Sequence, residues 1–204
     1  MSGPTVHIVD DDAGIRDALS WLLASRGLAA VEWPSGEAIL AALPLEDCAC
    51  IILDVRMMGS SGPEVFDQLR ARGCLAPVIF LTGHADVPVA VHALKAGAFD
   101  FIEKPFNDNQ IVDVVLAAMA THAARQADAA QRRDLSDRLA ALSPRETEVM
   151  RLMLTGSLNK QIADTLGIAV RTVEVHRSRI LTKMGVRTAM ELAHALSASP
   201  DPVG

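Results

Sequence analysis

The sequence predicts two domains, an α/β domain built on a five-stranded parallel sheet and, after it, a small all-helical domain. In residues 1–124, five short apolar runs alternate with five segments of helical spacing, a pattern typical of a parallel sheet covered by helices on both faces. From residue 141 onward, only helical spacing remains. Charge divides the chain in the same way: residues 1–124 hold 7 Lys and Arg against 16 Asp and Glu, and residues 142–204 hold 8 against 6.

The strands of the first half are expected at the apolar runs Val6–Val9, Ala29–Trp33, Cys48–Val55, Pro77–Thr82 and Phe99–Glu103. The segments between them repeat apolar residues at helical spacing and end at glycine or proline. They predict helices at Ala13–Arg26, Ser35–Leu43, a stretch that contains Val65, Phe66 and Leu69, then Val87–Ala96 and Ile111–Ala124.

A helical linker is expected at residues 125–140, because this stretch is rich in Ala, Arg and Asp and lacks Gly and Pro. Leu135, Leu139 and Leu142 give it a thin apolar stripe, which fits a solvated helix and a coupling element equally well. A helix then begins at Ser143-Pro144, where Glu146 completes a capping box, and Gly156 follows it. Three further helices are predicted, at 159–166, 170–184 and from Thr188 to about Ser197. Their spacing and the tight turn at Gly167 are typical of a helix-turn-helix.

Polar side chains follow four of the expected strands at the point where each strand ends: Asp10 and Asp11, Asp54, Thr82 and Lys104. The carboxyl ends of parallel strands share one edge of a sheet, so these groups are expected to converge there. Crowded carboxylates repel one another, and a divalent cation that prefers oxygen ligands, Mg²⁺ or Mn²⁺, would keep them ionised. One carboxylate could then act as a nucleophile on a phosphoryl group, whose oxygens the cation and Lys104 would neutralise.

Taken singly, each of these residues has an ordinary explanation, since an aspartate after a strand is commonly a helix cap or a solvated loop residue. Their combination is far more specific. Residues 5–122 resemble the receiver domain of two-component response regulators, and the matching positions are Asp10-Asp11, Asp54, Thr82, Phe101 and Lys104-Pro105. The run Leu81–Pro88 resembles the FixJ-type subfamily.

The resemblance implies a flavodoxin-like, doubly wound sheet of order 2-1-3-4-5, with Asp54 as the phosphoacceptor and Lys104 beside it. It implies Asp11, Asp54 and the backbone carbonyl of Arg56 as ligands of Mg²⁺ or Mn²⁺, with Asp10 nearby, and Thr82 and Phe101 as the switch pair. One position departs from the family. Met57-Met58 stands where Met-Pro is usual, and without the fixed φ of proline we expect weaker metal binding or an altered phosphoryl lifetime.

The third helix of the second half has two faces. Val173, Ile180 and Met184 are expected to point inward. Residues 140–198 resemble the LuxR-type helix-turn-helix through Leu142–Glu146, Asn159-Lys160, Thr172–His176 and their neighbours. Cations for phosphates and short side chains for base edges predict a DNA-binding set of Lys160, Arg171, Thr172, Glu174, Val175, Ser178, Arg179 and Lys183. Ala169 replaces the usual serine cap, which predicts a weak start for this helix.

Several classes of function are disfavoured. Cys48, Cys50 and Cys74 lack metal-ligand spacing and are interpreted as reduced thiols, most simply in a cytoplasmic protein without a membrane span or signal peptide. No Gly-rich nucleotide loop is present, so we expect that the chain is not an enzyme and that it accepts phosphate from a sensor histidine kinase rather than from ATP.

These features predict a response regulator with a receiver at residues 1–124, a linker at 125–140 and a DNA-binding domain at 141–204. Phosphorylation of Asp54 would drive homodimerisation and binding to an inverted repeat in promoter DNA, with RNA polymerase as a further candidate partner. The expected dimer surface consists of Val91, Lys95, Asp100 and Phe101. Two alternatives remain, a DNA-binding regulator that acts without phosphorylation and a phosphorelay or phosphate-sink protein.

Overall fold

The computed structural model describes residues 3–83 and 87–197. The chain divides into two compact units, Met1–Arg125 and Gln126–Gly204. None of the helices in these described ranges combines the length and the apolar character that crossing a membrane requires.

The first unit contains a five-stranded sheet of order β2-β1-β3-β4-β5, in which each pair of neighbours is parallel. Its strands are β1 (Thr5–Val9), β2 (Ala29–Trp33), β3 (Cys48–Asp54), β4 (Val78–Thr82) and β5 (Asp100–Glu103). β3 and β4 are apolar almost throughout because helices cover both of their faces. The predicted fold class and strand order are confirmed.

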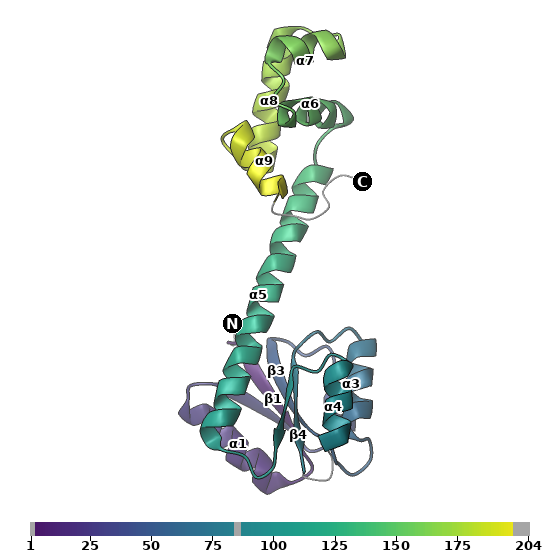
Figure 1. Ribbon diagram of the computed structural model, residues 1–204, viewed down its shortest axis with the longest axis vertical. Coiled ribbons are helices and arrows are strands. Elements are labelled where there is room, and N and C mark those ends of the chain that lie inside the picture. Colours follow the sequence, from purple (N-terminus) through teal and green to yellow (C-terminus); the bar gives the residue numbers. More distant parts are fainter. Residues whose placement is uncertain (1–2, 84–86, 198–204) are drawn as a thin grey trace. The chain divides into compact units, whose positions relative to one another are not determined.

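Helices lie on both faces of this sheet (Figure 1). The helices of the first unit are α1 (Ala13–Ser25), α2 (Gly36–Ala41), α3 (Gly62–Ala71), α4 (Val87–Lys95) and the beginning of α5 (Asp108–Ala140). One core layer joins Leu19 and Leu23 of α1 to Val115 of α5, and the other is filled by Phe66 and Phe80, whose rings meet edge to face. The two layers hold the sheet rigidly, so the residues at its strand ends have fixed positions.

The second unit contains four described helices after α5, namely α6 (Pro144–Leu154), α7 (Asn159–Leu166), α8 (Val170–Met184) and α9 (Ala189–Ser197). Val149, Ile162 and Leu192 are fully buried at their centre. The turn from α7 to α8 is short because Gly167 adopts a left-handed φ of 65° and ends α7. This arrangement is the predicted helix-turn-helix.

α5 is longer than the sequence indicates. The predicted fifth helix, 111–124, and the predicted linker, 125–140, form a single helix that begins at Asp108. It begins there because the side chain of Asn107 accepts hydrogen bonds from the backbone N–H groups of Asn109 and Gln110 and so caps the helix.

Candidate functional site

The polar residues at the strand ends converge as predicted. Asp54 is the last residue of β3, Thr82 ends β4, and Asp10 and Lys104 directly follow β1 and β5. The Nζ of Lys104 lies 2.8 Å from Oδ2 of Asp10 and 3.0 Å from Oδ1 of Asp54. A single ammonium group therefore binds the carboxylates of two separate strands, which is the central geometric feature of the site.

These carboxylates are poorly hydrated. Asp10 is 1% exposed and Asp54 is 7% exposed. Burial raises the pKa of Asp54, and the bonds from Lys104 offset that effect only in part. Burial alone would lower the pKa of Lys104, but its bonds to Asp10 and Asp54 outweigh burial and raise the pKa. The lysine is accordingly held charged, and the site keeps an excess of negative charge.

Asp11 completes the acidic cluster. Its Oδ2 accepts a hydrogen bond of 2.9 Å from the backbone N–H of Met58, in the loop after β3. Carboxylate oxygens of Asp10, Asp11 and Asp54 lie within 4.8 Å of one another. Three convergent carboxylates, two of them buried, make an oxygen donor set that fits a hard divalent cation such as Mg²⁺. Asp12, in contrast, caps α1 by accepting from the backbone N–H of Gly14 at 2.8 Å.

The loop between Asp54 and α3 is held at several points despite the missing proline. Glu37 of α2 accepts hydrogen bonds from the N–H and the hydroxyl of Ser60, and these bonds lower the pKa of Glu37 to about 2. Gly62 begins α3 so close to Asp54 that a side chain there would collide with the backbone carbonyl of Asp54. These contacts fix the backbone on which Asp54 and Arg56 lie.

The other predicted residues of the first unit differ in their burial and their contacts. The Thr82 hydroxyl is buried and donates to the Gly83 carbonyl at 3.1 Å, and Phe101 is half-buried against the core layer of α3 and α4. Arg56 is exposed beside the acidic cluster. Val91 and Lys95 are exposed on α4, and Asp100 is half-buried, with Oδ1 accepting from the N–H of Phe101. Part of the Leu81–Pro88 motif, residues 84–86, lies outside the described residues.

In the second unit, α8 presents the two faces that the sequence predicts. Val173, Ile180 and Met184 are buried. The opposite face is exposed and carries Arg171, Thr172, Glu174, Val175, Ser178 and Arg179. Lys160 is exposed on the neighbouring α7. On the exposed face of α8, Val175 is the apolar member at 43% exposure.

Lys183 differs from the other predicted DNA contacts. Its Nζ lies 2.7 Å from Oε2 of Glu146, which is buried, and donates to the backbone carbonyl of Ala141 at 3.0 Å. The Lys183 side chain is 37% exposed, and a DNA phosphate would compete with these two partners for its ammonium group. The sequence predicts Glu146 as part of a capping box, and the structure confirms it. The sequence does not predict that the distant Lys183 binds the same carboxylate.

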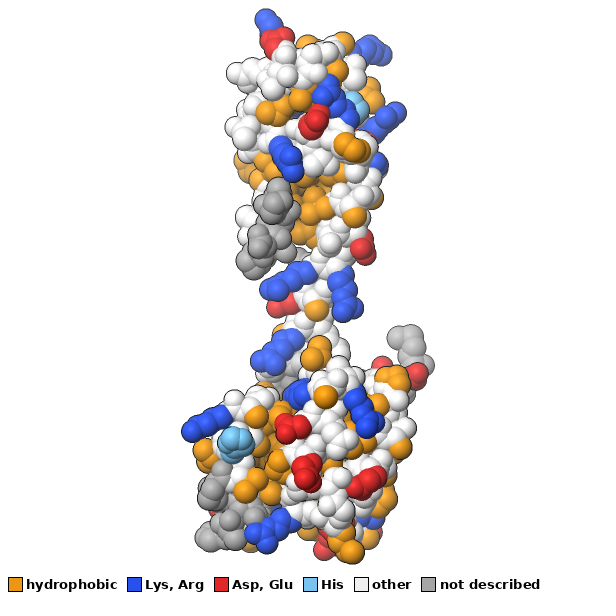
Figure 2. All heavy atoms as spheres, turned by 90° about the vertical axis from the view of Figure 1, so that its right-hand side faces the viewer, with side chains coloured by type: hydrophobic (Ala, Val, Ile, Leu, Met, Phe, Trp, Pro, Cys, Tyr) orange, Lys and Arg blue, Asp and Glu red, His pale blue; other side chains and the backbone are white. Residues whose placement is uncertain are grey.

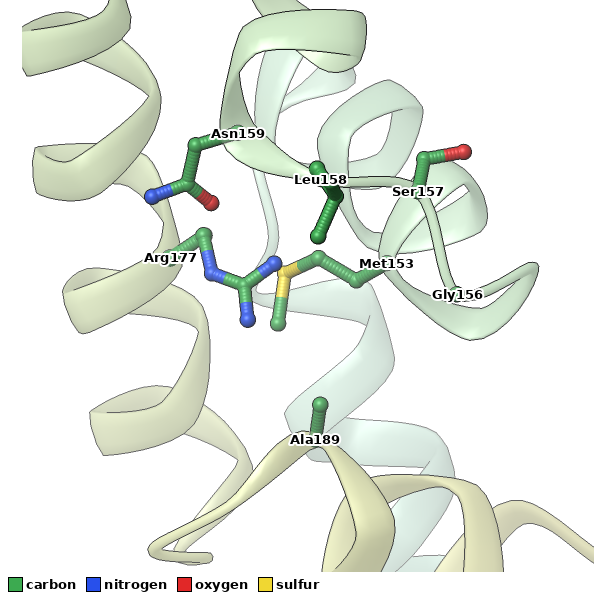
Figure 3. A pocket seen from close by; sticks show the side chains of 7 residues that line it. All are labelled: Met153, Gly156, Ser157, Leu158, Asn159, Arg177 and Ala189. Carbon is green, nitrogen blue, oxygen red and sulfur yellow. The ribbon is translucent and has the colours of Figure 1, made fainter.

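Arg177 is a half-buried cation of α8 that the predicted DNA-binding set does not include. It lines a pocket of about 470 Å³ together with Met153, Leu158 and Asn159. Figure 3 shows its guanidinium group pointing into this pocket, beside the Met153 side chain. On the face of the second unit seen in Figure 2, Lys and Arg are spread among apolar side chains. On this face the cations are thus dispersed, in keeping with the small net charge of this half.

The two ends of α8 are capped differently. At the first residue, Ala169 supplies no side-chain hydrogen bond, as its chemistry predicts. At the other end Gly185 adopts a left-handed φ of 68° and its N–H bonds to carbonyls of the last turn. The two ends of α8 thus differ in how their terminal backbone groups are bonded.

Both halves of the chain match known families. Residues 6–116 match the family described as "Response regulator receiver domain", and residues 140–196 match "Bacterial regulatory proteins, luxR family". The chain is 62% identical to the C4-dicarboxylate transport transcriptional regulatory protein DctR of Rhodobacter capsulatus, over 93% of this chain and 97% of the relative. It is 47% identical to the transcriptional regulatory protein FixJ of Azorhizobium caulinodans, over 97% of this chain and 94% of the relative.

Solved structures give the same result. The low-resolution structure of the response regulator StyR superposes with a TM-score of 0.90 at 37% identity, covering 97% of this chain and 100% of the other. Full-length FixJ from B. japonicum gives 0.62 at 37% identity, with 97% of each chain covered.

Proposed function

The chain belongs to the two-component response regulators that combine a receiver domain with a LuxR-type DNA-binding domain, and on this premise we propose that Asp54 accepts a phosphoryl group from a sensor histidine kinase and thereby controls binding to promoter DNA. Residues 1–124 would act as the receiver, 125–140 as the linker and 141–204 as the DNA-binding domain. The observation that carries the proposal is the Lys104 ammonium held between Asp54 and Asp10.

The chemistry follows from the positions of these side chains. An Asp54 carboxylate oxygen attacks the phosphorus of a phosphohistidine, the new O–P bond forms, and the P–N bond to the kinase breaks. Lys104 neutralises charge on the transferred group, and the Thr82 hydroxyl, released from Gly83, donates a hydrogen bond to it. Asp11, Asp54 and the Arg56 carbonyl, with Asp10 nearby, would hold Mg²⁺ or Mn²⁺. The bound cation would supply charge neutralisation for the phosphoryl oxygens.

Phosphoryl incorporation from acetyl phosphate in the presence of Mg²⁺ tests this assignment. We expect the unaltered chain to be labelled and Asp54→Asn to remain unlabelled, because the amide is not a nucleophile. Asp12→Asn is the matched control, since this residue caps α1 outside the acidic cluster and asparagine caps equally well. Stoichiometric labelling of Asp54→Asn would refute the assignment. A chain that is never labelled would favour a regulator that binds DNA constitutively.

The exposed face of α8 is proposed to enter the major groove, with Arg179 at a guanine edge and Lys160 at a phosphate. Arg179→Ala should cost about 1–3 kcal/mol on the preferred sequence and relax the sequence preference. Lys160→Ala should weaken binding to all sequences alike and reduce its salt dependence. If Arg179→Ala and Lys160→Ala weaken binding to the preferred duplex and to the shuffled duplex to the same extent, this division of roles is wrong. A chain that binds no duplex would favour a phosphorelay or phosphate-sink role.

We also propose that phosphorylation produces a homodimer through Val91, Lys95, Asp100 and Phe101. Movement of Thr82 toward the phosphoryl group would leave space for Phe101 near α4, and a symmetric pair would let Lys95 meet an acidic group of the second copy. Two linked domains would bind an inverted repeat more tightly than one. Sedimentation with and without beryllofluoride should show a monomer become a dimer. An unchanged mass in both states would contradict this step.

The similarity to DctR leads to a proposal about the regulated genes. At 62% identity over 93% of the chain, we propose that its promoters include those of C4-dicarboxylate transport genes. Genome-wide mapping of the bound DNA should find sites upstream of such genes, and their absence from the bound set would overturn the proposal. RNA polymerase recruited at these promoters remains a candidate partner.

A further inference from the structure

The last turns of α5 are part of the DNA-binding unit. Leu135 and Leu139 pack against the same core cluster as Val173, Ile180 and Met184 of α8. Leu142, just after α5, is 9% exposed and belongs to that cluster. The apolar stripe of the linker is therefore packed against the core of the second unit, which includes residues of the helix that carries the proposed DNA contacts.

Hydrogen bonds also join α5 and the residue that follows it to the carboxyl end of α8. The Nη1 of Arg138 donates to the backbone carbonyl of Met184 at 2.8 Å. In return, Lys183 donates to the backbone carbonyl of Ala141 at 3.0 Å. Asp134, one turn before Arg138, lies 2.9 Å from its Nη2 and orients the guanidinium group. A guanidinium at a helix carboxyl end also interacts favourably with the helix dipole.

We propose that Arg138 is a positioning residue for DNA recognition, which sets the direction of α8 by holding its carboxyl end against the end of the linker. The inference rests on the proposed role of α8 in reading DNA. The amino end of α8 has no side-chain cap at Ala169, and Arg138 bonds its carboxyl end. A small rotation about that end would displace every exposed contact residue nearer the amino end.

Gly185 lies against the same guanidinium group. A Cβ atom at this position would collide with Nη1 of Arg138. The left-handed φ of 68° already favours glycine here. The close approach of the guanidinium gives a second reason for glycine, and it provides a second way to displace Arg138 without changing the arginine.

The test compares DNA discrimination in matched variants of the full chain. The probe is the duplex that the unaltered chain enriches from a random-sequence library, and the reference is the same duplex with its sequence shuffled. Arg138→Ala should lower the ratio of the two affinities by roughly fivefold or more, comparable to one mismatched base pair. Arg138→Lys should recover part of the ratio, because lysine can still donate to the Met184 carbonyl. Gly185→Ala should lower the ratio as Arg138→Ala does.

Arg133→Ala is the matched control, since it removes the same charge from an exposed position of the same helix. It should leave the ratio unchanged, so a loss confined to Arg138 cannot come from net charge. Helix content and the melting temperature of each variant establish that measurements are made on folded protein. If Arg138→Ala lowers only the melting temperature, or lowers both affinities in parallel, the residue is merely structural and the proposal is overturned. If the unaltered chain enriches no duplex, the proposed DNA-binding function fails instead, and with it this inference.

Discussion

At the scale of single residues, Lys104 holds two buried carboxylates that would otherwise repel each other. Lys104→Ala removes the cation that both carboxylates bind. This loss is costly because Asp10 and Asp54 are almost fully buried. We expect the free energy of unfolding to fall by about 1–3 kcal/mol in a buffer with EDTA. Millimolar Mg²⁺ should recover part of this loss by binding the folded state. Chemical denaturation in the two buffers measures both effects, and an equal loss with and without Mg²⁺ would argue against a metal site at these carboxylates.

Met58 gives a second prediction at this scale. Its N–H donates to Asp11, a bond that a proline at this position could not make. Met58→Pro should free the Asp11 carboxylate and stiffen the loop, so Mg²⁺ affinity should rise, by up to about tenfold if one hydrogen bond to a charged group is released. Calorimetric titration with Mg²⁺ measures it. Met58→Ala, which keeps the N–H, is the control and should change little. A weaker affinity in the proline variant would mean that this N–H supports Asp11 as a metal ligand.

The positions of Asp10, Asp54, Thr82 and Lys104 could be predicted from the sequence because each directly follows or ends an apolar run. The bond between Met58 and Asp11 could not, because a backbone donor carries no signal in the side-chain pattern. Arg16, whose Nη1 donates to the Asp10 carbonyl at 2.7 Å, was missed for a related reason. On a helix, an arginine that supports a site resembles any solvated arginine.

At the scale of the elements, most boundaries follow from Gly, Pro and capping residues. Ser35, Ser143 and Thr188 bond the N–H groups that a cap should bond. The linker was the exception. Its composition predicts a helix, but its thin apolar stripe does not reveal that Leu135 and Leu139 pack against the core of the second unit, because that packing joins residues far apart in the sequence.

The bond between α6 and α8 leads to a prediction about pH. The hydrogen bond from Lys183 and that from the Ser143 N–H lower the pKa of Glu146 to about 2, against an ordinary value of 4.5. The stabilisation this carboxylate provides is fully present above about pH 4.5 and is lost as the pH falls toward about 2. Glu146→Gln should cost about 1–3 kcal/mol at pH 7 and remove this part of the pH dependence.

Amide hydrogen exchange in α6 and α8 of the unaltered chain and of Glu146→Gln measures this effect. Glu148→Gln is a suitable control, because Glu148 is exposed and lies two residues further along the same helix. If protection in the unaltered chain is flat between pH 4.5 and pH 2.5, the pair of Glu146 and Lys183 contributes less than its geometry implies.

At the scale of the whole molecule, the two units have different chemistry. The first is acidic and carries the phosphoacceptor cluster, whereas the second has a slight excess of cations. A single DNA-binding domain with so small a charge should bind weakly, so the proposed mechanism needs two copies acting together. The fold class and the family could be predicted from local patterns. The means by which a phosphoryl group changes DNA binding could not, since it depends on contacts between distant residues.

The most direct test of the central claim is the affinity of the full chain for its enriched duplex, measured with and without acetyl phosphate in the presence of Mg²⁺. The account predicts that the phosphodonor tightens binding by about tenfold or more for the unaltered chain. Asp54→Asn should bind with the weaker affinity in both conditions. Equal affinities of the unaltered chain in the two conditions, or an equal response of Asp54→Asn, would contradict the account.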